Sequence, residues 1–280
     1  METNGDARMG EDSSTGVGGD GVVGFEVAAG LRCDVRTASG NLRISEGQDS
    51  SCQVRMSTND PDPQQRFSKV KSTYDAATNQ LLVDTNPGQA ITDAGAGIKK
   101  VWSRWIDNVR HDVDLELIVP AGASVKFRTA SGDLRADVAL DDLDIANASG
   151  DVSVSSVAGS LRCRSASGDV EAGNVGGGVE CKTASGDVRL ERVGGDVNIQ
   201  GVSGDVSLTI DQPVAARINT VSGDVRVGVA AGLFIDVDAN TVSGDLASEI
   251  PLDGDRGGSA EKALELKVRT VSGDVKIHRS

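Results

Sequence analysis

The chain has 280 residues and a formal net charge of -14, so its surface repels the phosphates of nucleic acids and the headgroups of anionic membranes. Glycine accounts for 35 residues and aromatic residues for only 2%, which favours short β-strands joined by glycine turns around a core of small aliphatic side chains. These numbers exclude a thick aromatic core and predict no nucleic-acid partner.

Residues 1–20 are rich in glycine, serine and acidic residues, and we expect them to form a disordered N-terminal tail. They lack a basic segment followed by an apolar one, and no stretch of about 20 apolar residues occurs anywhere in the chain. The sequence therefore predicts no integral membrane segment and a cytoplasmic protein. The alternative is a location at the cell surface, reached by an unrecognised route.

Residues 21–120 predict an irregular β region that leads into a more regular part and caps it. Residues 31–44 contain one copy of the repeat that dominates the later chain, and further strands are expected at 51–57, 80–84 and 111–120.

One segment of this region, residues 98–110, is both aromatic and basic, and its apolar residues have helical spacing. We interpret it as a cover for an open end or edge of the β-structure; a helix that docks on a partner or a membrane is the alternative. The candidate capping or interaction residues are Trp102, Trp105, Lys99, Lys100 and Arg104.

Residues 121–246 are a repeat. The string Ser-Gly-Asp recurs with its glycine at positions 132, 150, 168, 186, 204, 223 and 244, and half-way copies at 159, 177 and 195 reduce the unit to nine residues. In each unit the second and fourth positions are apolar and the third is polar, as in a strand with one buried face. Alternate units end in Ala-Ser-Gly or in Val-Ala-Gly and Val-Gly-Gly, so two units form one turn of a solenoid.

The sequence thus predicts an all-β fold, a right-handed parallel β-solenoid with nine-residue units and eighteen-residue coils. After the regular part, residues 247–263 predict an acidic, glycine-rich loop, and residues 264–280 the terminal strands of the solenoid.

The aspartate of each Ser-Gly-Asp turn is expected to stack along one edge of the solenoid. Carboxylates about 4.8 Å apart repel one another by roughly 0.9 kcal/mol even in water, so we interpret each carboxylate as an acceptor of backbone N–H groups in its own or the neighbouring turn. The alternative is a calcium-binding edge, because the nine-residue unit resembles that of calcium-binding β-rolls. Its residues would be Asp133, Asp151, Asp169, Asp187, Asp205 and Asp224.

Two further columns follow from the repeat. Threonine often stands two residues before the serine of Ser-Gly-Asp, and we interpret it as a β-branched flank of the turn, with an ice-binding ladder as the alternative. Cys163 and Cys181 occupy the same inward position in successive coils, so they should be adjacent in the core, as buried thiols rather than a disulfide.

No arrangement of residues predicts catalysis, a resident metal or a cofactor. The two histidines, His111 and His278, are far apart in sequence, and no nucleophile or ligand set accompanies them. A carbohydrate-active β-helix enzyme is a remote alternative, since such an enzyme needs clustered carboxylates and aromatic platforms.

Three segments carry a resemblance to a known family: residues 183–190 (TASGDVRL), 115–125 (LELIVPAGASV) and 266–280 (LKVRTVSGDVKIHRS). Together they resemble the bacterial β-strand-repeat proteins called "putative adhesins", a domain of unknown function found in actinobacteria among others. The resemblance implies a non-enzymatic scaffold or interaction protein whose partner is an unknown protein or a cell-surface component. A calcium-stabilised cell-surface adhesin is the alternative.

Overall fold

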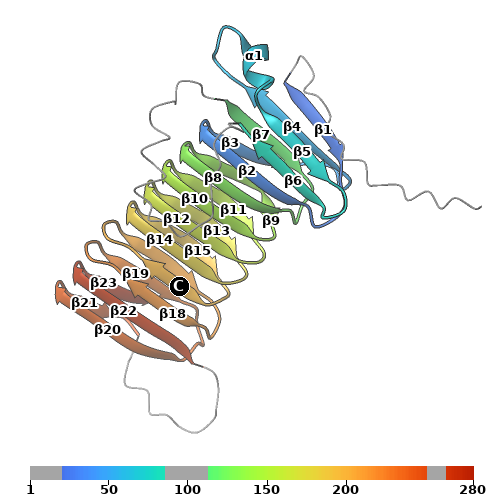
Figure 1. The fold of residues 1–280 in the computed structure, drawn as a ribbon. Coiled ribbons are helices and arrows are strands. Elements are labelled where there is room, and N and C mark those ends of the chain that lie inside the picture. Colours follow the sequence, from blue (N-terminus) through green and yellow to red (C-terminus); the bar gives the residue numbers. More distant parts are fainter. Residues whose placement is uncertain (1–20, 86–112, 251–262) are drawn as a thin grey trace, which may run out of the picture.

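The computed structural model describes residues 21–85, 113–250 and 263–280. They form two long β-sheets that face each other and share one hydrophobic core (Figure 1). Sheet A has 11 strands, in the order β20 (Ile235–Ser243), β22 (Leu264–Ser272), β18 (Ala215–Asn219), β16 (Val197–Gln200), β14 (Val179–Ser185), β12 (Leu161–Ser167), β10 (Leu143–Ser149), β8 (Ser124–Ser131), β2 (Arg32–Ser39), β6 (Gln80–Asp84) and β5 (Lys71–Asp75).

Sheet B has 12 strands. Their order is β1 (Val22–Glu26), β4 (Ser51–Ser57), β7 (Asp114–Val119), β3 (Leu42–Glu46), β9 (Leu134–Leu140), β11 (Val152–Val157), β13 (Val170–Val175), β15 (Val188–Val193), β17 (Val206–Ile210), β19 (Val225–Val229), β23 (Val275–Arg279) and β21 (Leu246–Ser248). A short helix, α1 (Pro63–Phe67), lies at the β1 end of the stack (Figure 1).

Each nine-residue unit is one strand, and successive units alternate between the sheets. The chain leaves β10 through a Ser-Gly-Asp turn, runs along β11 in sheet B and returns through a Val-Ala-Gly turn to β12 in sheet A. The parallel register pairs Leu143 with Leu161, the equivalent residue two units later. The predicted all-β parallel solenoid with two units per coil is therefore confirmed.

The core consists of stacked small aliphatic side chains. In sheet A, Ile145, Cys163, Cys181 and Ile199 follow one another in register, and all are buried. Because every inward position repeats at the strand spacing of about 4.8 Å, like side chains pack on like along the whole stack. Small aliphatic side chains fill most of the space between the two sheets, and Phe127 of β8 is the buried aromatic residue of the parallel coils in the described ranges.

The first end of the stack departs from parallel pairing. Strand β1 pairs antiparallel with β4, β4 with β7, and β5 with β6. Buried aromatic side chains gather here: Phe25 and Tyr74 lie with ring centroids 6.0 Å apart, and Phe67 of α1 is buried as well. Antiparallel strands and a helix thus close this end of the solenoid.

The opposite end departs from chain order. Strand β22 lies between β18 and β20, and β23 lies between β19 and β21. The coil formed by β20 and β21 is therefore outermost, although β22 and β23 come later in the chain (Figure 1). The sequence motif marks equivalent positions in the coils and leaves their order in the stack undetermined.

Candidate functional site

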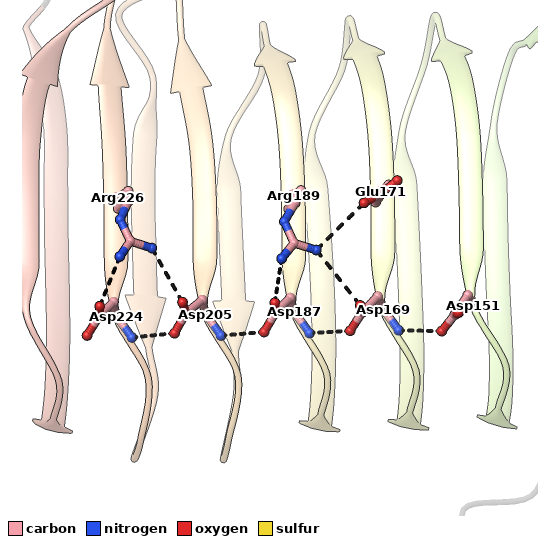
Figure 2. Close-up of polar contacts among 8 residues, drawn as sticks. All are labelled: Asp151, Asp169, Glu171, Asp187, Arg189, Asp205, Asp224 and Arg226. Atoms are coloured by element: carbon pink, nitrogen blue, oxygen red, sulfur yellow. Dashed lines mark hydrogen bonds and ion pairs between the residues drawn. The ribbon is translucent and has the colours of Figure 1, made fainter.

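A ladder of aspartates runs along the edge where sheet A turns into sheet B (Figure 2). The backbone N–H of Asp151 donates to Oδ1 of Asp133, one coil earlier, at 2.9 Å. The same bond, between 2.8 and 2.9 Å long, recurs through Asp169, Asp187, Asp205, Asp224, Asp274 and Asp245. The structure thus shows every carboxylate of the ladder except that of Asp245, in the outermost coil, accepting a backbone N–H from the adjacent coil.

Arginines on sheet B offset part of the repulsion between these carboxylates. Arg189 approaches Asp187 at 2.6 Å and Asp169 at 3.8 Å, and Arg226 approaches Asp224 at 3.0 Å and Asp205 at 3.4 Å. Figure 2 shows each guanidinium lying across two neighbouring coils. Each arginine therefore stands between two carboxylates that would otherwise repel each other.

Asn41 is the aspartate's equivalent in the first coil. The N–H of Asp133 donates to Oδ1 of Asn41 at 3.0 Å, and the N–H of Asn41 donates to Oδ1 of Asp114 at 2.7 Å. A neutral amide oxygen therefore serves in the ladder as well as a carboxylate does.

No metal-binding arrangement is found in the described part of the chain, where no three or more His, Cys, Asp or Glu side chains are grouped so as to hold an ion. The aspartates of the ladder lie one per coil, and all but Asp245 have one oxygen engaged by a backbone N–H. The calcium-binding edge stays a prediction.

The threonine column lies inside the turn. Thr37, Thr129, Thr183 and Thr220 are buried, and each hydroxyl donates to the carbonyl oxygen two residues later, at 2.6 to 3.3 Å. These hydroxyls satisfy turn carbonyls and are withdrawn from solvent. The interpretation as turn flanks holds, and an exposed ice-binding ladder is not formed.

The four cysteines are buried free thiols. Cys163 and Cys181 are register partners in sheet A, as predicted. A hydrogen bond with Cys181, followed by burial, raises the pKa of the Cys163 thiol well above its usual value, and the hydrogen bond between Cys33 and Cys52 does the same for Cys33. The thiols of Cys163 and Cys33 are therefore protonated and unreactive at neutral pH.

The predicted capping or interaction residues Trp102, Trp105, Lys99, Lys100 and Arg104 lie outside the described residues. Their role stays a prediction.

A shallow depression of about 280 Å³ lies on sheet A, over β12, β14, β16 and β18. Its lining includes Arg162, Glu180, Asp196, Asn198 and Arg217. The nearest ion pair across it, from Arg162 to Glu180, is 3.9 Å long. The Lys182 ammonium, first through its hydrogen bond and then through its charge, lowers the pKa of Glu180, so this carboxylate is ionised at neutral pH.

The sequence showed that the third position of each unit is polar but not that its charges accumulate on one face. That pattern appears only when alternate units are assigned to different sheets. The signal was present in the sequence, because the fifth position of the sheet A units is often Arg or Lys: Arg36, Arg128, Arg164, Lys182 and Arg269.

Two sheets joined by Ser-Gly-Asp turns and linked by an aspartate ladder characterise the chain, and a family model matches over residues 107–278. The chain belongs to the Toastrack DUF4097 family. Members of this family have no established function. No curated protein matches this Toastrack chain.

Solved structures resemble the Toastrack chain in outline. A putative adhesin from Bacteroides fragilis NCTC 9343 is 16% identical, with a TM-score of 0.46 over 92% of this chain and 96% of that one. A putative lipid binding protein from Parabacteroides distasonis ATCC 8503 is 13% identical, with a TM-score of 0.39 over 92% and 96%. A putative cell adhesion protein from Clostridium sporogenes ATCC 15579 is 11% identical, with a TM-score of 0.27 over 92% and 99%.

None of the helices among the described residues has the length and apolar character needed to span a membrane.

Proposed function

We propose that this Toastrack protein is a non-enzymatic interaction scaffold of the adhesin type. The observation that supports this most directly is the register between coils, which holds the outward side chains in straight columns. Lys126, Asp144, Arg162 and Glu180, for example, are consecutive register partners on sheet A. A stiff surface with one side chain per coil suits an extended partner, which meets the same spacing repeatedly.

The depression on sheet A supports binding rather than catalysis. Its volume of about 280 Å³ lies just below the range of about 300 to 1,000 Å³ that is usual for small-molecule sites. A general acid in a glycosidase needs a carboxyl group whose pKa is raised, whereas the pKa of Glu180 is lowered by Lys182. These features favour a scaffold over the carbohydrate-active enzyme.

The proposed scaffold is tested by titrating fluorescently labelled protein against intact cells and isolated cell envelopes of a bacterium that carries the protein. Saturable binding that unlabelled protein displaces is expected, together with no release of sugar from a panel of glycans in the same tubes. Glycan cleavage, or the absence of saturable binding, would contradict the proposal. Protease treatment of intact cells separates the predicted cytoplasmic location, where the protein is protected, from the cell surface, where it is digested.

The aspartate ladder favours one second candidate, a calcium-stabilised surface adhesin. Calorimetry decides between the two: a rise in melting temperature in Ca²⁺ beyond that in Mg²⁺ supports the adhesin with calcium. Equal melting curves in both ions, with no heat of Ca²⁺ binding, support the metal-free scaffold.

A further inference from the structure

The outer face of sheet A carries an excess of positive charge, although the chain as a whole is strongly acidic. Across the eight strands from β8 to β20 in sheet order, the outward side chains include eight cations and five acids. The cations are Lys126, Arg128, Arg162, Arg164, Lys182, Arg217, Lys267 and Arg269, and the acids are Asp144, Glu180, Glu265, Asp236 and Asp238.

Half of these cations are already paired with acids. Arg128 approaches Asp34 at 3.3 Å and Arg164 approaches Asp144 at 3.8 Å, while Glu180 is shared by two cations, Arg162 at 3.9 Å and Lys182 at 3.1 Å. These pairs lie over β2 to β14, the half of the face nearer the capped end.

Among the described residues, the cations of this face without an ion pair are Lys126 on β8 and the three cations of the other half. Arg217 and Lys267 are register partners on β18 and β22, and Arg269 lies two residues beyond Lys267 on the same strand. The nearest acids by register are Glu265, on the same strand, and Asp238, opposite Lys267 on β20. No carboxylate in the described ranges lies within ion-pair distance of the three, which we call the cation triad (Arg217, Lys267 and Arg269).

The cations of sheet B have a different role. Arg189 and Arg226 are the same kind of outward residue, and both are bound to the aspartate ladder. Stability of the solenoid thus accounts for Arg189 and Arg226 but not for the cation triad, in which Arg217 and Lys267 are like charges opposite each other on adjacent strands. An external anion would offset that repulsion.

Neutral hydrogen-bonding groups surround the cation triad. Asn198, Gln200 and Asn219 are exposed on β16 and β18, and among the described residues their side chains make no hydrogen bond. The depression between Arg162 and Arg217 adjoins them. Phe234 lies just before β20 and is 65% exposed. Measured along the strands, it is about 13 Å from Lys267.

We propose that this face, from β16 to β20, binds a linear acidic polysaccharide whose carboxylate groups pair with the cation triad. The proposal rests on the scaffold function and names its ligand class. Arginine binds carboxylates through two parallel N–H groups, the amides suit sugar hydroxyls, and Phe234 offers an apolar ring surface to a sugar ring. Nucleic acid fits less well, because single strands need a row of aromatic platforms.

The test measures binding of the full chain to polygalacturonate by calorimetry at low and at moderate salt, with neutral dextran and single-stranded DNA as comparison ligands. The main variant is Arg217→Gln/Lys267→Gln/Arg269→Gln. The matched control, Arg135→Gln/Arg192→Gln/Lys276→Gln, changes the net charge by the same amount on sheet B. A third variant, Phe234→Ala, changes no charge. Melting curves verify that each variant folds, which we expect because every substituted side chain lies on the surface.

The wild-type protein is expected to bind polygalacturonate, with an affinity that falls with salt, and to bind dextran and DNA much more weakly. The triad variant should lose about tenfold in affinity and most of the salt dependence, and the sheet B control less than twofold. Phe234→Ala should weaken binding without changing its salt dependence.

Equal losses in the triad variant and its control, tighter binding of DNA, or no binding of polygalacturonate would each overturn the proposal. The envelope titration described above distinguishes failure of the polysaccharide proposal from failure of the proposed scaffold function. If the triad variant binds envelopes as the wild type does, the scaffold stands and the polysaccharide face does not.

Discussion

The glycine of each Ser-Gly-Asp turn occupies a position that only glycine can fill. These glycines, the seven of the regular repeat and Gly273 of the last turn, have φ between 117° and 150°, a region closed to other L-residues. A Cβ on Gly168 would overlap the carbonyl oxygen of Gly150 in the coil below. Both the turn conformation and the stacking distance therefore require glycine.

We expect Gly168→Ala to lower the free energy of unfolding by about 3 kcal/mol or more, because it combines a forbidden φ with a backbone clash. Gly30→Ala is the matched control: Gly30 also has positive φ, at 73°, but nothing lies within 4 Å of an added Cβ. Its cost should be about 1 kcal/mol. Urea unfolding measures both, and equal costs would show that stacking adds nothing.

The aspartate ladder makes a second prediction at this scale. Because Asn41 already serves as an acceptor, Asp169→Asn should preserve the hydrogen bond to the N–H of Asp187 and change stability by less than about 0.5 kcal/mol. Asp169→Ala leaves that N–H without its partner and should cost about 1 kcal/mol. Thermal melting of the two variants at the same pH tests this, and a large loss in the asparagine variant would mean that the charge itself is required.

At the scale of the strand, the sequence predicted more about each element than about its neighbours. The alternation of apolar and polar residues and the Ser-Gly-Asp spacing located the strands, the turns and the contact of Cys163 with Cys181. Neighbour order could not be obtained in this way, because every coil presents the same motif to the next. The unusually long interval between Gly244 and Gly273 was the only sign that the last coils are exchanged.

Of the candidate site, the aspartate ladder could be predicted from the sequence and the cation triad could not. The aspartate edge follows from one repeated motif, so its residues and its backbone hydrogen bonds could be anticipated. The cation triad brings together Arg217 and Lys267, which are distant in the sequence and meet only because β22 is inserted beside β18. A pattern read along the chain cannot show that contact.

The exchanged coils predict unequal sensitivity in neighbouring strands. Val268 of β22 is fully buried between two strands, whereas Val237 of the outermost strand β20 is only partly buried. Val268→Asp should place an unpaired charge in the core and prevent folding or cost several kcal/mol, while Val237→Asp should cost about 1 kcal/mol. Circular dichroism during urea unfolding measures the difference; if the two substitutions cost the same, the order of the last two coils is wrong.

At the scale of the molecule, the repeat means that the length of the solenoid can change by whole coils while the remaining coils keep their structure. Twelve strands in sheet B correspond to a stack about 53 Å long at about 4.8 Å per strand. The capped end carries three of the four buried aromatic residues in the described part of the chain, and the far half carries the cation triad. Stability of the middle coils comes from their two neighbours, as in other repeat proteins.

Removing residues 152–169 deletes one coil and joins Asp151 to Val170, which is the register partner of Val152. This variant should fold, melt cooperatively and be about 4.8 Å shorter by small-angle X-ray scattering. Removing only residues 152–160 is the control, because it places a sheet A unit in sheet B and breaks the alternation of turns. That variant should be largely unfolded, and a well-folded product would contradict the assignment of two units to each coil.

The insertion of β22 and β23 also sets the order in which the chain can fold. Coils from β8 to β19 can stack one after another as they are synthesised, since each finds its preceding neighbour already in place. The coil of β20 and β21 cannot, because the surface on which it rests is made of residues 264–279, which emerge after it. We therefore expect this end of the solenoid to remain open during synthesis and to close in a single late step.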